Sequence, residues 1–393
     1  MRDRLRRGFA TQLLLVAALV LSASIASEAR EAPRVVAIGD VHGAYEPLLR
    51  ILGAAELVDG EGHWIGARAT LVQVGDLIDR GADDRKVLEF MMRLEREAKA
   101  AGGRVIALLG NHEVMNLHGD LRYVSVESFA SFADPSSQRR LEAAYEKYLR
   151  LRWPADEQTV PETWKSFIAK RPAGFLEQRE AFGRKGHIGR WLRQRRAVAK
   201  IGDVVFLHGG FHPEVASFGV AKINARIKTE LAIFDSARDY LVRRRRILPS
   251  ADIEEVDAAA RRELESARRI SERDRRDLEL LGTYRNWVIA HPTGPLWFRG
   301  LAKWSDDELA ARVPEVLEEL DAKHIVIGHT AQLDGGIVSR LDGKVVLIDT
   351  GILGGAFYPG GVLQALEIIE GRFQIIDIHG ARVAVVSKPE KET

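Results

Sequence analysis

The sequence predicts an α/β protein built around a parallel β-sheet, with helical insertions and a β-rich C-terminal portion. From Arg34 onward, a short apolar run, a polar loop containing glycine and a helical stretch follow one another, and this pattern occurs three times. Parallel strands need long crossover connections, usually helices, so the pattern is typical of βαβ units. The ligand site of such a sheet lies at the carboxyl ends of its strands, where the three polar loops fall.

The first three units place strands and helices in a regular order. Their strands are expected at 35–38, 70–74 and 105–109, and the helices after the first two loops at 44–53 and 83–100. The chain has 393 residues, which is enough for one large domain or two ordinary ones.

Residues 121–196 break this pattern because they are charged, helix-like, rich in Trp and Arg, and interrupted by proline. We expect an inserted helical region whose aromatic residues form either its own core or a wall of a substrate pocket. These aromatic residues are Trp153, Trp164, Phe167, Phe175 and Trp191.

Strands at 197–200 and 203–207 follow. A second helical insertion, 220–281, carries charges of mixed sign, which is typical of a solvated helix face rather than of a nucleic acid-binding patch.

The C-terminal portion begins with an amphipathic helix at 305–321 and a strand at 324–327. Four β-like runs separated by Gly or Asp-Gly turns come next, and we expect them to form a second, largely antiparallel sheet. These runs are 337–340, 345–349, 362–368 and 373–378.

The N-terminal residues have the order of a secretory signal peptide: basic residues, an apolar run from Leu13 to Leu21, then small residues. We expect residues 1–29 to be a signal peptide and the protein to be exported, to a periplasm or to the medium. The apolar run is shorter than the roughly 20 residues that a membrane span needs, although its flanks extend it, so an uncleaved membrane anchor is the alternative. Arg6 and Arg7 leave both the general and the twin-arginine export routes open.

The charge and cysteine counts exclude several classes of partner and site. Without residues 1–26, 54 basic and 55 acidic residues remain, so the exported domain is close to neutral and gives no reason to expect a nucleic acid partner. The chain contains no cysteine, which excludes disulfides and thiolate metal sites.

Five polar motifs carry residues that can bind metal ions. They are GDVHG at 39–43, GDLIDRG at 75–81, GNHE at 110–113, LHGG at 207–210 and GHT at 328–330. Asp40 and His42 are two residues apart on one turn, so both can reach one ion. Asp76 is the natural bridge, because a carboxylate can donate one oxygen to each of two ions. The second ion would be completed by Asn111, His208 and His329. Two ions about 3.5 to 4 Å apart can hold a bridging hydroxide and bind phosphoryl oxygens during in-line attack.

These motifs resemble those of the calcineurin-like metallophosphoesterase superfamily, and GDVHG, GDLIDRG and GNHE are similar to the motifs of its phosphoprotein phosphatase branch. The sequence EVMNLHGDLRYV after GNHE, with GPLWFRG at 294–300 and GHT in place of GHxH, resembles the Shewanella-like protein phosphatases. The resemblance implies a four-layer αββα sandwich of two mixed β-sheets flanked by helices. This catalytic domain would span residues 33–381, followed by a tail at 382–393.

The resemblance also implies two divalent metal ions on the ligands named above, and manganese, iron, zinc and cobalt all accept such nitrogen and oxygen ligands. It makes His112 the general acid, held by Asp79, and Arg80 a clamp on the phosphate. Arg299 is our candidate for a second clamp, with a structural arginine as the alternative. Ala331 stands where relatives with GHxH carry another histidine, which disfavours the small-molecule phosphodiesterase branches.

We therefore expect a bimetal phosphomonoesterase, a protein phosphatase acting on phosphoserine, phosphothreonine or phosphotyrosine in a phosphorylated protein or peptide. One alternative is a nucleotide or dinucleoside polyphosphate hydrolase, and another, from a different class, is a non-catalytic exported binding module. His118 and His212 follow motif loops and are candidates for lining the pocket. We expect the remaining histidines to be structural or exposed.

Overall fold

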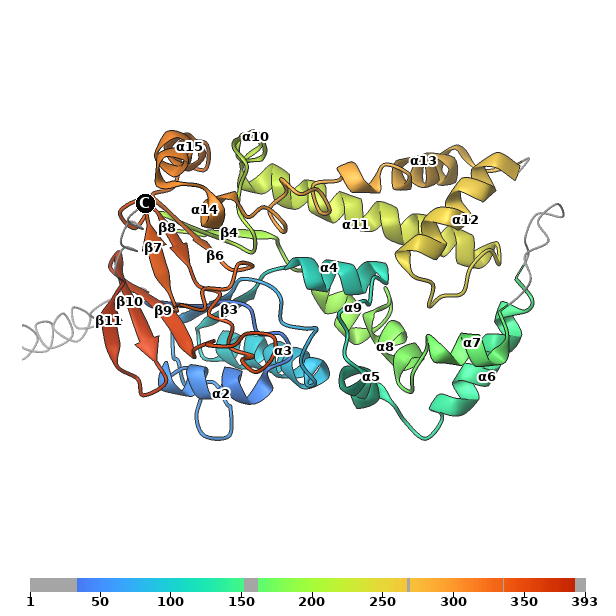
Figure 1. Cartoon of the computed structure of the whole chain (residues 1–393), viewed down its shortest axis with the longest axis horizontal. Helices are drawn as coiled ribbons and strands as arrows, with labels where there is room; N and C mark the ends of the chain where they lie inside the picture. The colour runs from blue at the N-terminus through green and yellow to red at the C-terminus, as the bar shows by residue number, and fades with distance from the viewer. Residues whose placement is uncertain (1–33, 152–161, 267–268, 335, 386–393) are drawn as a thin grey trace, which may run out of the picture.

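The computed structural model describes residues 34–151, 162–266, 269–334 and 336–385, and they form two mixed β-sheets packed face to face (Figure 1). The first sheet has the strand order β11-β10-β9-β1-β2-β3 and the second the order β4-β5-β6-β8-β7. The strands of the first sheet are β1 (Arg34–Ile38), β2 (Thr70–Gln73), β3 (Arg104–Ala107), β9 (Gln364–Ile369), β10 (Arg372–Asp377) and β11 (Arg382–Ala384). Those of the second are β4 (Val198–Ile201), β5 (Val204–Leu207), β6 (His324–Ile327), β7 (Val338–Arg340) and β8 (Val345–Leu347).

Successive side chains along a strand point alternately into two hydrophobic cores, one between the two sheets and one under the helices, as expected for strands with two buried faces. Val35 and Ala37 of β1 belong to the hydrophobic core between the two sheets, together with Phe206 of β5. Val36 and Ile38 point the other way, into the core that the helices cover. The result is the four-layer αββα sandwich with two mixed sheets that the resemblance implies.

Helices cover the outer face of each sheet. Helices α2 (Tyr45–Ala54) and α3 (Asp84–Ala100) lie on the first sheet (Figure 1). Helix α15 (Asp306–Glu319) lies on the side of the second sheet, and Ser305 and Glu308 form a capping box at its start. These helices, and all the strands except β11, begin and end within two residues of the predicted bounds. Strand β11 was not predicted.

The C-terminal runs do not form a sheet of their own, so that prediction is wrong. β8 pairs in parallel with β6 in the second sheet, whereas β9 pairs antiparallel with β1 and thereby joins β9, β10 and β11 to the first sheet. Turn signals specify a hairpin but not the distant strand beside which it lies, which explains the error. Strand β11 also carries the first sheet beyond residue 381, the predicted end of the domain.

The two insertions lie side by side at the end of the molecule opposite strands β10 and β11 (Figure 1). The first contains α5 (Val126–Phe132), α6 (Ser137–Tyr148), α7 (Trp164–Ala169), α8 (Phe175–Phe182) and α9 (His187–Leu192). The second contains α11 (Gly219–Arg243), α12 (Ile253–Ser266) and α13 (Glu272–Leu281). No helix within the described ranges is long and apolar enough to cross a membrane. The predicted signal peptide, 1–29, lies outside the described residues.

The aromatic residues of the first insertion pack within the helices rather than forming a wall of the site. Phe167 is fully buried and contacts Trp164, Tyr145 and Tyr148. The indole of Trp191 donates a hydrogen bond of 2.6 Å to Glu95 on α3. Trp153 lies outside the described residues.

Candidate metal centre

The six predicted metal ligands converge at the carboxyl ends of the parallel strands, on loops from both sheets. Asp40 follows β1, Asp76 follows β2 and His208 follows β5. All six are buried, and their exposed fractions are at most 7%. The set is Asp40, His42, Asp76, Asn111, His208 and His329. The sheet topology therefore brings together residues that lie up to 289 positions apart, as in the 2.9 Å hydrogen bond from the His329 amide to Asp40 Oδ1.

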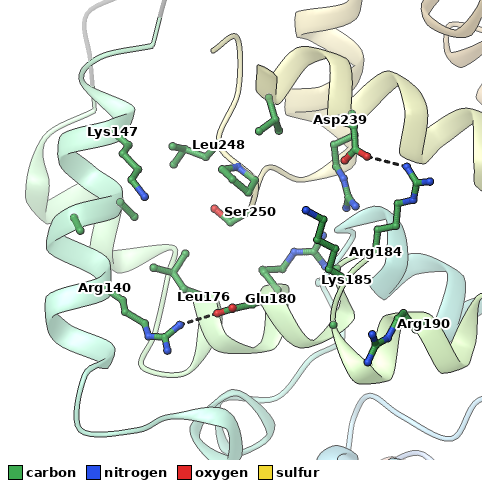
Figure 2. Close-up of a pocket in the computed structure, with 18 residues that line it drawn as sticks. Arg140, Lys147, Leu176, Glu180, Arg184, Lys185, Arg190, Asp239, Leu248 and Ser250 are labelled. Carbon is green, nitrogen blue, oxygen red and sulfur yellow. Dashed lines mark hydrogen bonds and ion pairs between the residues drawn. The ribbon is translucent and has the colours of Figure 1, made fainter. Parts of the chain in front are cut away.

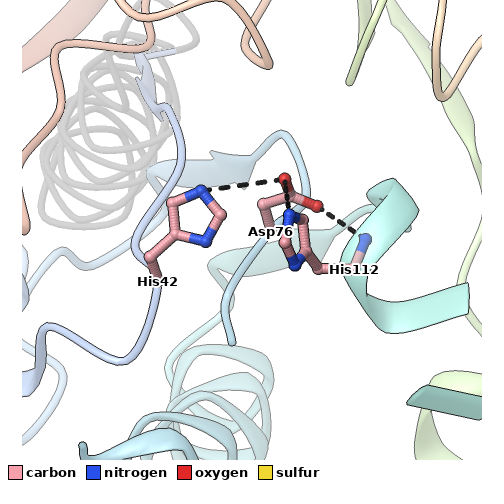
Figure 3. A group of neighbouring side chains, drawn as sticks. All are labelled: His42, Asp76 and His112. Carbon is pink, nitrogen blue, oxygen red and sulfur yellow. Dashed lines mark hydrogen bonds and ion pairs between the residues drawn. The ribbon is translucent and has the colours of Figure 1, made fainter. Parts of the chain in front are cut away.

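The carboxylate of Asp76 lies between His42 and His112 (Figure 3), and Asp76 also belongs to a second group of potential ligands. Its Oδ1 accepts a hydrogen bond of 3.0 Å from the backbone N–H of His112, at the first turn of helix α4 (Asn111–His118). Its Oδ2 is surrounded by imidazole nitrogens, at 3.8 Å from His42 Nε2, 3.7 Å from His112 Nε2 and 3.2 Å from His208 Nε2. Two groups of potential metal ligands share Asp76, one with His42 and His112 and one with His208 and His329. This arrangement fits a bridging carboxylate.

Each of the three predicted histidine ligands is oriented by a backbone carbonyl. Nδ1 of His42 donates to the carbonyl of Ile78 at 3.0 Å, and Nδ1 of His208 donates to that of Val74 at 3.2 Å. Nε2 of His329 donates to the carbonyl of Trp297 at 3.2 Å. The opposite ring nitrogen of each histidine is therefore the one left for a metal ion.

Burial keeps two of these imidazoles, those of His42 and His329, in the form that binds metals. It lowers the pKa of His42 to about 3 and that of His329 to about 2. A neutral imidazole has a free lone pair, whereas a protonated one has none. Asn111 Oδ1 lies 2.9 Å from His208 Nε2, so the amide oxygen faces the same space.

Asp349 is a further buried carboxylate beside Asp40 at the centre, and the sequence analysis did not identify it. It follows β8, is 1% exposed and accepts a hydrogen bond from the Gly351 amide at 3.0 Å. Within the described part of the chain no hydrogen-bond donor reaches its Oδ2. Burial raises the pKa of both Asp40 and Asp349. The charges of Asp349 and Asp76 raise the pKa of Asp40 further, and the charge of Asp76 adds to the rise for Asp349. Buried carboxylates without cationic partners are costly, so this chemistry fits divalent cations held among them.

Backbone strain is concentrated at the same place. Non-glycine residues at the centre adopt positive φ angles, which side chains with a Cβ atom rarely do. These residues are His42 (51°), Asp76 (58°), Asp79 (73°), Arg80 (70°) and His329 (66°). Sequence patterns gave no indication of these angles, since none of these residue types requires them.

Glu113 of the GNHE motif holds the strained Asp76 loop in place. It is fully buried, and its oxygens accept hydrogen bonds from the amides of Asp76 and Leu77, both at 2.8 Å, and of Gly110 at 2.7 Å. Gly110 is required because a Cβ atom there would lie 2.2 Å from Asp76 Oδ1. The motif therefore supplies both a ligand and the support for its neighbour.

His112 and Asp79 form the predicted pair. His112 Nδ1 donates to Asp79 Oδ2 at 2.6 Å, and Asn116 Nδ2 donates to Asp79 Oδ1 at 2.8 Å. Burial lowers the pKa of His112, but the carboxylates of Asp76 and Asp79 outweigh it and the net pKa is raised. Nε2, the nitrogen not bound to Asp79, is the one on the side of Asp76. The pair can therefore hold a proton on the imidazole beside the metal ligands.

Arg80 lies over the centre between two tyrosines that sequence reasoning did not identify. Its guanidinium donates to the hydroxyl of Tyr358 and contacts His42 Nε2. It also stacks on the rings of Tyr358 and Tyr123, at 5.5 and 5.8 Å from their centroids. Tyr358 stacks in turn on His42 at 5.7 Å. A guanidinium in this position can form paired hydrogen bonds to phosphate oxygens.

Arg299 reaches the centre, where its side chain contacts the loop that carries His329. Nη1 donates to the backbone carbonyl of His329 and, at 3.0 Å, to the hydroxyl of Thr330. It thereby holds the loop that carries His329. The structure joins Arg299 to this loop, and its action as a second phosphate clamp stays a proposal.

The two other histidines of the motif loops lie elsewhere. His118 is buried at the end of α4, where its ring packs at a tilt against Phe234, with 4.1 Å between the ring centroids. Its Nδ1 lies 2.9 Å from the Tyr284 hydroxyl. The interpretation of His118 as a pocket residue is therefore wrong. His212 is half-buried and packs edge-on against Phe298, and among the described residues it forms no hydrogen bond or ion pair with a predicted metal ligand.

Comparisons with known proteins agree with this geometry. Residues 33–333 match the family described as calcineurin-like phosphoesterase. The chain is 31% identical over 323 residues to an uncharacterized protein of Schizosaccharomyces pombe, covering 81% of this chain and 73% of that protein. It is 35% identical over 214 residues to Shewanella-like protein phosphatase 2 of Arabidopsis thaliana, covering 52% and 53%. The crystal structure of the cold-active protein-tyrosine phosphatase of a psychrophile, Shewanella sp., has a TM-score of 0.59 and 27% identity, covering 90% of this chain and 80% of that one.

Proposed function

This chain belongs to the calcineurin-like phosphoesterase family and is a phosphoester hydrolase, and on that premise we propose that it is a metal-dependent protein phosphatase. The single observation that carries the proposal is the arrangement around Asp76: its Oδ2 faces three imidazoles, one of which is paired with Asp79. A binding module without catalysis has no use for the buried His112 and Asp79 pair, which disfavours that alternative.

Two divalent ions would be held by the six predicted ligands, with Asp76 between them, and when bound they would supply Lewis acidity and an activated water. Manganese, iron, zinc and cobalt all accept this set of nitrogen and oxygen ligands. The buried, unpaired carboxylate oxygen of Asp349 and the three oriented imidazoles support the presence of such ions.

The residues around the ligands have separate tasks in this proposal. Arg80 binds two oxygens of the phosphoryl group and is held in position by Tyr358. His112 gives the proton on Nε2 to the leaving oxygen, while Asp79 keeps the other ring nitrogen hydrogen-bonded and fixes the ring orientation. Arg299 holds the His329 loop and is the candidate for the second phosphate contact.

The substrate we propose is a phosphorylated side chain of a protein or peptide. Tyr123, which is 44% exposed, and Tyr358 flank Arg80, so a phosphate bound there has aromatic surface beside it. The similarity to proteins named as a protein phosphatase and a protein-tyrosine phosphatase supports the same substrate class. A dinucleoside polyphosphate would bring further phosphates, for which the predicted site residues include only Arg80 and Arg299.

The test is a comparison of three substrates with the purified, metal-supplemented protein. We expect a phosphotyrosine peptide or a phosphoserine peptide to exceed diadenosine polyphosphate in kcat/KM, and the order of the two peptides assigns the residue preference. Hydrolysis of the diadenosine compound at least tenfold more efficiently than either peptide would overturn the protein phosphatase assignment and leave the phosphoesterase one intact.

We also propose that the protein is exported, on the basis of the basic, apolar and small segments of residues 1–29. Sequencing of the protein from its source should find a mature N-terminus near Ser27 or Arg30 in the periplasmic or secreted fraction. Intact protein starting at Met1 in the cytosolic fraction would refute export, and the same protein in the membrane fraction would identify an anchor.

A further inference from the structure

A second cavity lies among the inserted helices, away from the metal centre (Figure 2). Its volume is about 1140 Å³, and α6, α8, α11 and the segment 248–250 form its walls. None of the six predicted metal ligands lines it. The lining contains seven Arg or Lys side chains but only two acidic ones, Glu180 and Asp239. The cavity is therefore strongly basic in a domain that is otherwise close to neutral.

Both acidic side chains are already paired. Glu180 bonds to Arg140 at 2.7 Å and Asp239 to Arg184 at 3.1 Å, as the dashed lines of Figure 2 show. The remaining basic residues include Lys147 and Lys185 on opposite sides of the cavity. In residues 34–151, 162–266, 269–334 and 336–385, no carboxylate lies within ion-pair distance of either lysine. Positive charge in the cavity is thus left without compensation.

Two buried guanidinium groups point to the same conclusion. Arg179 is 4% exposed, and among the described residues its Nε has no hydrogen-bond partner. Arg238 is 5% exposed, and its Nη2 lies 3.4 Å from Oδ1 of Asp235. The Asp235 carboxylate already accepts two shorter hydrogen bonds, of 2.7 and 2.8 Å, from Arg193. Burial, together with Arg238 and Arg193, lowers the pKa of Arg179 to about 9. A buried guanidinium without an acidic partner is costly, and a bound anion would offset that cost.

The shape and chemistry of the cavity indicate which anion fits. Guanidinium groups form paired hydrogen bonds to phosphate oxygens, and lysines add charge to a dianion. Apolar side chains line the cavity as well, among them Leu176, Val242 and Leu248. A cavity of this size accommodates more than an inorganic ion, since small-molecule sites occupy about 300–1,000 Å³.

We propose that this cavity is a second, non-catalytic site that binds a phosphate monoester group carried on an apolar body. The phosphate would lie at Arg179 and Arg238, with Lys147 and Lys185 at the mouth and the apolar body against Leu176 and Leu248. No bond is made or broken at this site. It differs from the metal centre in its residues and in the helices that build it.

The test measures binding of phenylphosphonate, a phosphate monoester analogue whose carbon–phosphorus bond resists hydrolysis, to the metal-loaded protein by isothermal titration calorimetry. Arg179 is not varied, because its Nη1 also donates to the carbonyl of Asn116 at 2.5 Å and so supports the neighbour of Asp79. The probe variant is Lys147→Glu with Lys185→Glu. The matched control is Lys99→Glu with Lys222→Glu, two exposed lysines outside the cavity that give the same change in net charge.

We expect two phenylphosphonate sites in the native protein. The probe variant should weaken one of them at least tenfold, while the control stays within twofold of the native protein and both retain phosphatase activity. Arg80→Ala should weaken the other site and spare this one. A single site that is lost in Arg80→Ala and unchanged in the probe variant would overturn the proposal, as would equal weakening in probe and control.

A second measurement needs no variant. Acylation of lysines followed by mass spectrometry should show slower labelling of Lys147 and Lys185 when phenylphosphonate is present, with Lys99 and Lys222 unchanged. Equal labelling with and without the ligand at saturating concentration would contradict the proposal. Inorganic phosphate should bind the cavity more weakly than phenylphosphonate, and equal affinity would overturn the role of the apolar wall.

Discussion

Replacement of His112 by Asn tests the proton-transfer part of the proposed chemistry. The change removes the ring nitrogen Nε2, which lies 3.7 Å from Asp76 Oδ2, and the 2.6 Å hydrogen bond from Nδ1 to Asp79. It leaves the backbone N–H that holds Asp76 Oδ1, so the central carboxylate keeps its support. We therefore expect metal binding to persist and only the chemical step to slow.

The size of the effect follows from what a positioned general acid contributes. Such a group accelerates a reaction by about 10² to 10⁴, which corresponds to roughly 3 to 5 kcal/mol at about 1.36 kcal/mol per tenfold change. The full loss applies to phosphoserine, whose alkoxide leaving group must be protonated as it departs. An aryl phosphate with an acidic phenol as leaving group needs little protonation, so its kcat should fall much less.

The assay compares kcat for a phosphoserine peptide and for an activated aryl phosphate in the native protein, in His112→Asn and in the control His212→Asn. The control makes the same chemical change at a half-buried histidine that has no contact with Asp76 or Asp79. We expect the ratio of the two rates to change only in His112→Asn. An equal loss on both substrates, with metal content unchanged, would refute the role of His112 as the acid.

Four further outcomes are expected. Asp76→Asn should abolish turnover and lower the metal content found by elemental analysis, because Oδ2 loses its charge among three imidazoles; full activity with two bound metals would contradict the bridge. Arg80→Ala should lower kcat/KM by about 30-fold, or about 2 kcal/mol, in steady-state assays, whereas an unchanged value excludes the phosphate clamp. Glu113→Gln should lower the free energy of unfolding in urea by about 1 to 3 kcal/mol, since an amide cannot accept all three backbone N–H groups. An unchanged free energy of unfolding would argue against the support of the Asp76 loop by Glu113. Metal removal by a chelator should abolish activity and lower the melting temperature but preserve the far-ultraviolet circular dichroism spectrum, and a loss of that spectrum would show that the metals build the fold.

The convergence of the six predicted metal ligands was predictable because each follows an apolar run that forms a strand, and the carboxyl ends of parallel strands meet at one edge of a sheet. Asp349 obeys the same rule, as it ends the β-like run 345–349. It was missed because that run was assigned to an antiparallel sheet, whereas β8 pairs in parallel with β6. A residue at the end of an assumed antiparallel strand gives no reason to look for a ligand.

Tyr123 and Tyr358 were beyond prediction for a different reason. Tyr123 reaches Arg80 through the hydrogen bond from the Arg80 amide to its carbonyl, and Tyr358 comes from a glycine-rich loop 278 residues away. Tyr123 lies in the run EVMNLHGDLRYV that carries the resemblance, but that run alone assigns it no role, and Tyr358 belongs to no motif of metal ligands. Contacts of this kind depend on loop conformation, which local sequence does not specify.

The expected survival of the fold without metal rests on how the strain at the centre is held. Each positive φ angle of a non-glycine residue costs on the order of 1 to 3 kcal/mol, so Asp76 and its neighbours need support from elsewhere. Glu113 gives that support with three hydrogen bonds to the backbone, and Gln73 adds bonds to Gly39 and Gly75. These contacts join helix α4 and strands β1 and β2 directly, without a metal ion between them. Loss of the metals would leave the buried carboxylates of Asp40 and Asp349 to take up protons, as their raised pKa values indicate, while the loops that carry them stay in place.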